Sequence, residues 1–276
     1  MTVIGTMSEH RRNMRKSTKL KIICAVGIFA LNLANAALPA ISDAQAQAIG
    51  EKIWRNECAG TVSGLTSWNV GEDFPSLGIC HAIWYRKGQQ ERFLETFPLL
   101  VAYLKNHGAT LPEFLVKNPH NPWKTREEFL AAKDDTDMVE LRNFLHATIG
   151  LQARFTAERL EQALPKILAA APANSHATLT ARFHAVAATP QGIYALVDYV
   201  NFKGEGTRES ERYQGQGWGL LQVLQEMRDV PPGDAARQEF SRAAVSVLKR
   251  RIANSPPARG EQRWLAGWEN RCATYR

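Results

Sequence analysis

Apolar residues recur every three or four positions along most of the chain after residue 41, a spacing that is typical of helices with one buried face. Ser42 or Asp43 can cap a first helix that runs to about Glu57. Pro98 and Pro165 lie inside two of the later helical segments, where a proline removes a hydrogen bond and kinks the helix. These further helices are predicted at 89–106, 125–133, 136–148, 151–171, 174–188, 190–203, 216–228, 234–253 and from about 260.

The helical period is interrupted between residues 59 and 80 by Gly60, Gly64, Gly71, Pro75 and Gly78. Apolar residues occur there only in short pieces, which predicts a loop or a small β-hairpin region. Residues 107–123 contain three prolines and are predicted to form an irregular connector. The predicted fold class is therefore mainly α with a small β-hairpin region.

The first 36 residues have the pattern of an export signal. Six Lys or Arg residues precede an apolar run from Ile22 to Leu33, and Ala34-Asn35-Ala36 offers the small residues that a signal peptidase reads. The apolar run is shorter than the roughly 20 residues that a spanning helix needs. We therefore predict a signal peptide at 1–36 and an exported mature chain, periplasmic or secreted, at 37–276 without a stable membrane span; an uncleaved N-terminal anchor is the alternative.

The charge of the chain is concentrated in this leader. Six basic residues and one acid in residues 1–36 account for +5 of the formal net charge of +7, which leaves +2 for the mature chain. A mature chain with so small a net positive charge gives no reason to expect binding to nucleic acid. We find no spacing of Cys or His typical of a metal site and no glycine-rich phosphate loop, so no cofactor is expected. Three cysteines remain after the leader, enough for one disulfide with one thiol left over.

The segment from Ile53 to Tyr85 combines the side chains that glycoside hydrolysis uses. Glu57 closes the first predicted helix, Glu72 and Asp73 follow in a turn-rich stretch, and a hydroxyl comes next at Ser76. One carboxylic acid must protonate the leaving oxygen, and a second acid or a hydroxyl must stabilise the cationic centre or position water.

This segment resembles the phage-type lysozyme family. That family has a Glu-Gly pair at the end of its first long helix, a short hairpin bearing an Asp, and then a Thr-Ile-Gly-Ile-Gly-His motif. Glu57 stands at the position of the catalytic Glu and Ser76 at that of the catalytic Thr. Gly78, Ile79 and His81 repeat the end of the motif.

Several positions depart from the family pattern. The position of the catalytic Asp falls on Val70, which leaves Glu72 as the nearest substitute. Cys58 and Cys80 replace two glycines of the pattern. Because the shared fold would bring the helix end close to the hairpin, the resemblance implies a Cys58–Cys80 disulfide, with Cys272 left over.

The C-terminal third resembles the family more weakly. Residues 199–206 are similar to its Asn-Phe-x-x-Gly helix end beside the sugar cleft, and residues 267–271 are similar to its closing Gly-x-x-x-Arg helix, which ends here at Arg271. Residues 86–190 have no counterpart and would form an enlarged middle helical region. The resemblance implies a two-lobed, lysozyme-like domain with a cleft between the lobes.

The implied function is cleavage of the peptidoglycan glycan strand, with Glu57 as the general acid and Glu72 and Ser76 holding water or stabilising charge. His81 would support the site structurally. A non-hydrolytic glycan-binding or envelope-scaffolding protein and a lytic transglycosylase, which needs one catalytic acid, are the alternatives. The residues expected to contact the sugars are Trp68, Phe74, Asn201 and Glu205.

Overall fold

The computed structural model describes residues 38–89 and 93–276, so the predicted signal peptide lies outside the described residues. The described part is mainly α with a small antiparallel strand region, which confirms the predicted fold class. None of the helices in this part has an apolar stretch long enough to cross a bilayer.

The first helix, α1 (Asp43–Cys58), forms where its cap and apolar period predicted it. The Ser42 hydroxyl accepts a hydrogen bond from the backbone of Gln45, whose side chain accepts one from the backbone of Ser42 in return. Ile49 and Ile53 are buried on one face. The helix ends where Ala59 takes a left-handed conformation, which leaves Glu57 in the last turn.

The interrupted segment folds into a three-stranded antiparallel sheet of β1 (Thr66–Ser67), β2 (Ser76–Leu77) and β3 (Ala82–Ile83), in that order. The buried side-chain amide of Gln152 links this sheet to α6 (Ile149–Ala169). Gln152 accepts a hydrogen bond from the backbone of Ile79 at 3.0 Å and donates one to the carbonyl of Leu145 at 2.6 Å. Gly78 has a φ of +73° and an added Cβ would lie 2.4 Å from the Gln152 amide oxygen, so this close approach requires glycine.

The remaining helices follow the predicted order with shifted ends. The helix expected from Gln89 begins only at Phe97, so Pro98 lies in its first turn, where a missing N–H is harmless, and causes no kink. A short helix lies inside the connector predicted at 107–123. The helices are α2 (Phe97–Asn106), α3 (Glu113–Lys117), α4 (Arg126–Ala131), α5 (Thr136–Ala147), α6 (Ile149–Ala169), α7 (His176–Ala187), α8 (Pro190–Lys203), α9 (Leu220–Glu226), α10 (Asp234–Asn254) and α11 (Leu265–Ala273), with a hairpin of β4 (Arg212–Tyr213) and β5 (Gln216–Gly217) before α9.

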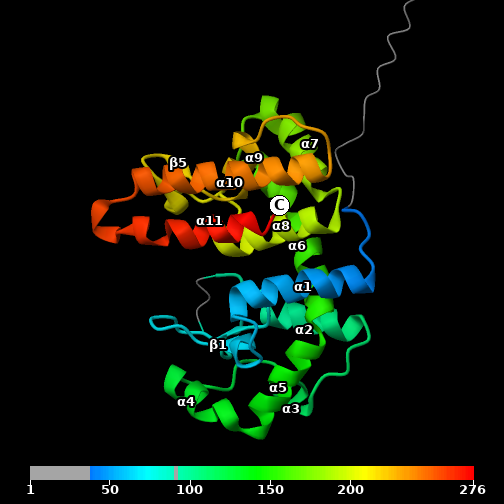
Figure 1. Cartoon of the computed structure of the whole chain (residues 1–276). Coiled ribbons are helices and arrows are strands. Elements are labelled where there is room, and N and C mark those ends of the chain that lie inside the picture. Colours follow the sequence, from blue (N-terminus) through cyan, green and yellow to red (C-terminus); the bar gives the residue numbers. More distant parts are fainter. Residues whose placement is uncertain (1–37, 90–92) are drawn as a thin grey trace, which may run out of the picture. The chain divides into compact units, whose positions relative to one another are not determined.

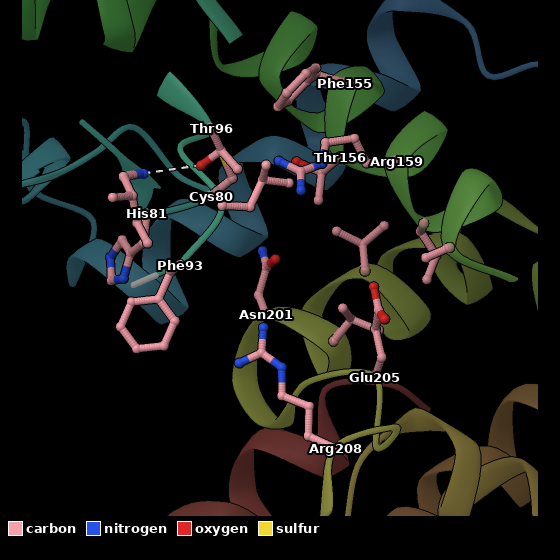
Figure 2. Close-up of a pocket in the computed structure, with 16 residues that line it drawn as sticks. Cys80, His81, Phe93, Thr96, Phe155, Thr156, Arg159, Asn201, Glu205 and Arg208 are labelled. Atoms are coloured by element: carbon pink, nitrogen blue, oxygen red, sulfur yellow. Dashed lines mark hydrogen bonds between the residues drawn. The ribbon is translucent and has the colours of Figure 1, made fainter. Parts of the chain in front are cut away.

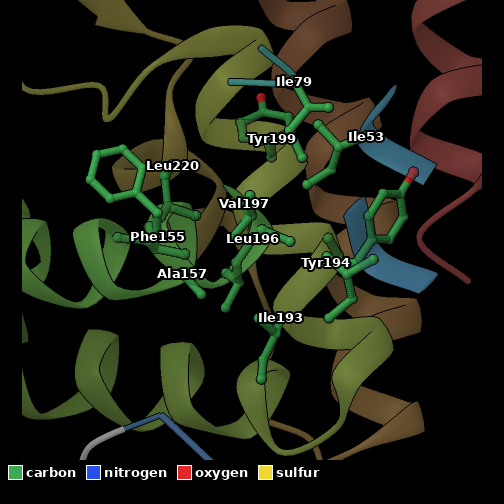
Figure 3. Packing of buried hydrophobic residues seen from close by; sticks show 14 of the residues in the cluster. Ile53, Ile79, Phe155, Ala157, Ile193, Tyr194, Leu196, Val197, Tyr199 and Leu220 are labelled. Atoms are coloured by element: carbon green, nitrogen blue, oxygen red, sulfur yellow. The ribbon is translucent and has the colours of Figure 1, made fainter. Parts of the chain in front are cut away.

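These elements pack in two groups on either side of α1 (Figure 1). One group holds the three-stranded sheet and α2–α5, and the other holds α7–α11. Helix α6 packs along α1 and contacts both groups, meeting α2 in one and α7–α9 in the other. Apolar side chains form a continuous core through this junction, including Ile53 of α1, Phe155 of α6 and Val197 of α8 (Figure 3).

Candidate functional site

Glu57, the predicted general acid, is paired with a cation from the far end of the chain. Its carboxylate accepts a hydrogen bond from the Arg271 guanidinium of α11, and the two side chains are only 14% and 15% exposed. This ion pair joins the end of the first helix to the closing helix, two of the segments whose sequence resembles phage-type lysozymes.

A second carboxylate lies on the other side of Arg271. Asp198 of α8 is fully buried and accepts two hydrogen bonds from the guanidinium, at 2.8 and 2.9 Å. It also accepts bonds from the Tyr275 hydroxyl at 2.7 Å and from the Asn56 amide at 3.0 Å. Burial alone would lower the pKa of Arg271, but its hydrogen bonds to Asp198 raise that pKa above its usual value. The guanidinium therefore remains charged and joins α1, α8 and α11.

The predicted residues of the hairpin make their hydrogen bonds within the hairpin itself. Ser76 is buried in β2, where its carbonyl accepts a hydrogen bond from the Ser67 hydroxyl at 3.2 Å. Glu72 lies in the turn before β2, where its carboxylate accepts a bond from Asn69 at 3.1 Å. No hydrogen bond or ion pair among the described residues joins Glu72 to Glu57. Glu72 is therefore held in the turn and makes neither of these contacts with Glu57, the acid that it was expected to assist.

Trp68 and Phe74 do not have the exposure that sugar stacking requires. They are 5% and 4% exposed, because each is packed against another ring: Trp68 on Phe129, with centroids 5.7 Å apart, and Phe74 on Tyr85, at 5.3 Å. The prediction that these two rings contact substrate is therefore wrong, and both are core residues.

The disulfide expected from the resemblance is absent from this structure, in which Cys58, Cys80 and Cys272 are all free thiols. The Cys80 thiol is turned towards α6, where it is hydrogen-bonded with Thr156. Burial raises the pKa of the Cys58 thiol to about 12 and that of Cys80 to about 11, so neither is readily ionised.

A cavity of about 440 Å³ contains the other predicted residues (Figure 2). His81, Asn201 and Glu205 all line it, so the structure brings His81 together with two side chains that are distant from it in sequence. This volume is within the range of about 300–1,000 Å³ for small-molecule sites. His81 adopts a left-handed backbone conformation, with a φ of +47°, at the start of β3. His81 lines the cavity with its ring beside that of Phe93, and its imidazole has no hydrogen-bond partner among the described residues, so no contact through which it would support the site structurally is seen.

The far wall of the cavity comes from α6, which the sequence did not single out. Phe155, Thr156 and Arg159 line the cavity from this helix, and Arg208 lines it from the loop after α8. The only sequence signal for Arg159 is that a cation follows Phe155 by four positions, close to an apolar helical stripe. A second hollow of about 340 Å³ shares Phe155, Arg159 and Glu205 with the first and extends the groove to Tyr103 and Lys166.

Helix α8 connects the cavity to the ion-pair network. Asp198 of the network and Asn201 of the cavity wall are three residues apart, so they lie about one turn apart on the same helix. The helix is fixed at its start by Thr189, whose hydroxyl accepts a bond from the backbone of Gly192. Next to Asn201, the ring of Phe202 lies 4.2 Å from the Arg271 guanidinium. Glu57 itself does not line either hollow, and its network reaches the groove wall only through α8.

Within the described residues, no group of three or more His, Cys, Asp or Glu side chains has an arrangement that would hold a metal ion. Comparison of the chain with protein-family models, with curated proteins and with solved structures finds no match.

Proposed function

We propose that this protein is an exported enzyme that cleaves the peptidoglycan glycan strand, with Glu57 as its general acid. One observation carries the proposal: Glu57, Arg271 and Asp198 form one network, and α8 extends from it to a groove lined by His81 and Asn201. The three stretches of sequence that resemble phage-type lysozymes are those that meet here.

Arg271 defines the chemistry that Glu57 can perform. In this structure the Glu57 carboxylate accepts a hydrogen bond from the Arg271 guanidinium, so it is not free to donate a proton while that contact lasts. The acid role therefore requires the entering glycan to loosen the ion pair, after which Glu57 takes up a proton and delivers it to the leaving oxygen. The carboxylate that results then accepts the proton of the attacking hydroxyl.

The position of Glu72 favours a lytic transglycosylase as the second candidate. In that reaction the attacking hydroxyl belongs to the sugar itself, so no second acid is needed to hold water. Glu72 is hydrogen-bonded to Asn69 in the turn, and Asp198 is fully occupied by Arg271, Tyr275 and Asn56. Of these three carboxylates, Glu57 is the one that we assign to proton transfer, once the glycan has loosened its contact with Arg271.

The test uses the purified mature protein and insoluble peptidoglycan. Glu57→Gln keeps the shape of the side chain and an acceptor for Arg271 but carries no acidic proton, so we expect glycan release to fall by about 10²–10⁴-fold. Glu72→Gln is the matched control and should retain most of the activity, whereas Ser76→Ala should show an intermediate loss. Equal activity of wild type and Glu57→Gln would contradict the assignment, and Glu205 would be tested next.

Mass spectrometry of the fragments separates the two reactions. Reducing ends indicate hydrolysis, and anhydro ends indicate the transglycosylase. A wild-type protein that sediments with cell wall but releases no fragments would support the glycan-binding or scaffolding alternative.

The proposed export has its own test. N-terminal sequencing of exported protein should begin at or near Ala37. A product that keeps residues 1–36 in the cytoplasm would contradict the predicted localisation.

A further inference from the structure

Three hydrogen-bond donors converge inside the groove without an acceptor to receive them. Arg159 and Arg208 point into the cavity from opposite walls, with Asn201 between them (Figure 2). Neither arginine forms an ion pair within the described part of the chain. The Asn201 amide nitrogen is buried and has no hydrogen-bond partner there either. Most buried polar groups in proteins are paired, so such a group at a cavity wall indicates an acceptor that is supplied from outside.

The charge of the cavity limits what that acceptor can be. Glu205 faces the same space, so the two arginines and this carboxylate give a formal charge of +1 with His81 neutral. A ligand with one negative charge suits this balance better than a polyanion, which the carboxylate would repel. Glu205 can also accept a hydrogen bond from a hydroxyl or amide of the ligand.

Most of the remaining lining is apolar, with Phe155, Leu160, Val197 and Val200 among its members, and the hydroxyls of Thr96 and Thr156 interrupt it. Such a wall suits the C–H face of a sugar and small alkyl substituents. The groove thus combines an apolar floor with donors for one carboxylate.

We propose that Arg159, Arg208 and Asn201 bind a carboxylate carried by the glycan, which makes an acidic amino sugar strand the preferred substrate over a neutral one. The identity of the glycan rests on the proposed function, but the carboxylate site rests on the cavity itself. Guanidinium groups bind carboxylates through paired, charge-assisted hydrogen bonds, and two of them on opposite walls hold the carboxylate in a defined orientation.

In peptidoglycan this carboxylate has two sources. It belongs either to the lactyl group of a muramic sugar without a peptide, or to the peptide stem. The chemistry that the cavity recognises is the same in both cases, so the experiment has to separate them.

The binding experiment uses the Glu57→Gln protein, so that cleavage does not consume the ligand. Calorimetry compares a stem-free muramyl tetrasaccharide, its methyl ester and the same tetrasaccharide with stems. We expect the methyl ester to bind at least tenfold more weakly than the free acid if the lactyl group is the source. Tightest binding of the stem-bearing form, with loss when its stem carboxylates are amidated, identifies the stem as the source.

Variants locate the effect in the cavity. Arg159→Gln and Arg208→Gln should each weaken binding of the acid about tenfold and leave the ester unchanged. Arg263→Gln, at an exposed position outside the cavity, is the control and should bind like the parent. Because the ester is a change in the ligand, this comparison does not depend on how the arginine variants fold.

Failure of this inference and failure of the proposed function give different results. If the wild type cleaves glycan while acid and amidated or esterified ligands bind equally, the carboxylate site is refuted and the enzyme remains. If nothing is cleaved but charge-dependent binding persists and requires the two arginines, the carboxylate site stands and the proposed function falls. Absence of binding to every form refutes the inference.

Discussion

Replacing Arg271 with methionine removes one cation from between the buried Asp198 carboxylate and the partly buried Glu57 carboxylate. Methionine keeps much of the aliphatic shape but neither the charge nor the donors. The variant loses both hydrogen bonds to Asp198, at 2.8 and 2.9 Å, and the ion pair with Glu57. Asp198 is fully buried, so water cannot replace the lost partner without opening the structure.

The expected cost follows from these contacts. Removing one partner of a buried ion pair destabilises a protein by about 3–5 kcal/mol, because the other charge is left uncompensated. Asp198 keeps its bonds from Tyr275 at 2.7 Å and Asn56 at 3.0 Å, which reduces the cost to the lower end of that range. The loss of the cation over Phe202 adds about 1 kcal/mol. We therefore expect Arg271→Met to lower the free energy of unfolding by about 4 kcal/mol.

Urea unfolding at neutral pH measures this difference. Arg55→Met is the matched control, since Arg55 is 67% exposed and 3.6 Å from Glu51, and it should cost less than about 0.5 kcal/mol. Adding Asp198→Asn to Arg271→Met should recover part of the loss, because the uncompensated charge is then gone. A cost below about 1 kcal/mol for Arg271→Met, or full additivity of the two changes, would refute this account of the network.

Three further changes test the physical analysis elsewhere. Burial alone would raise the pKa of Glu239, but hydrogen bonds from Arg242 and Arg228 lower that pKa to about 2. Glu239→Gln should therefore cost about 2–3 kcal/mol of stability at neutral pH. Because the stabilisation from a lowered carboxyl pKa is lost in acid, urea titrations should show this cost shrinking from about pH 4.5 to 2. Burial lowers the pKa of Lys203 from 10.5 to about 7, so the wild type should gain about 4–5 kcal/mol of stability between about pH 7 and 10.5. A gain that persists in Lys203→Met would contradict the assignment. Gly192→Ala would place a Cβ 1.7 Å from a carbonyl oxygen of α7, and thermal unfolding should show a loss of more than about 2 kcal/mol.

Local patterns predicted the elements of this fold well where several signals agreed. The first helix had a cap, an apolar period and a terminating loop, and all three are present in α1. The second helix shows the limit of such patterns. Its period extended back to Gln89, but burial begins at Phe97 and continues through Leu100 and Leu104, while Leu94 stays exposed. Which turn of a periodic segment meets the core depends on tertiary packing, and a single sequence does not contain that information.

The candidate site was predictable in its residue types but only partly in its contacts. Glu57 and Arg271 were both named from local motifs, yet nothing in either motif indicates that they pair. Trp68 and Phe74 were expected to contact the sugars because an aromatic ring suits the C–H face of a sugar, although their neighbours in space, Phe129 and Tyr85, make them core residues. Residue type says what a side chain can do, whereas its neighbours decide whether it is free to do it.

The ion pair between Glu57 and Arg271 also constrains the order in which the molecule can assemble. The two residues are 214 positions apart, so their contact closes most of the chain into a loop. While the polypeptide is being synthesised, Glu57 and Asp198 are already present when α11 is not, and Asp198 then lacks the cation that makes its burial tolerable. We therefore expect α8 to pack only weakly against α1 until α11 has been synthesised. We expect the docking of α11 to be the step that commits the chain to its native state.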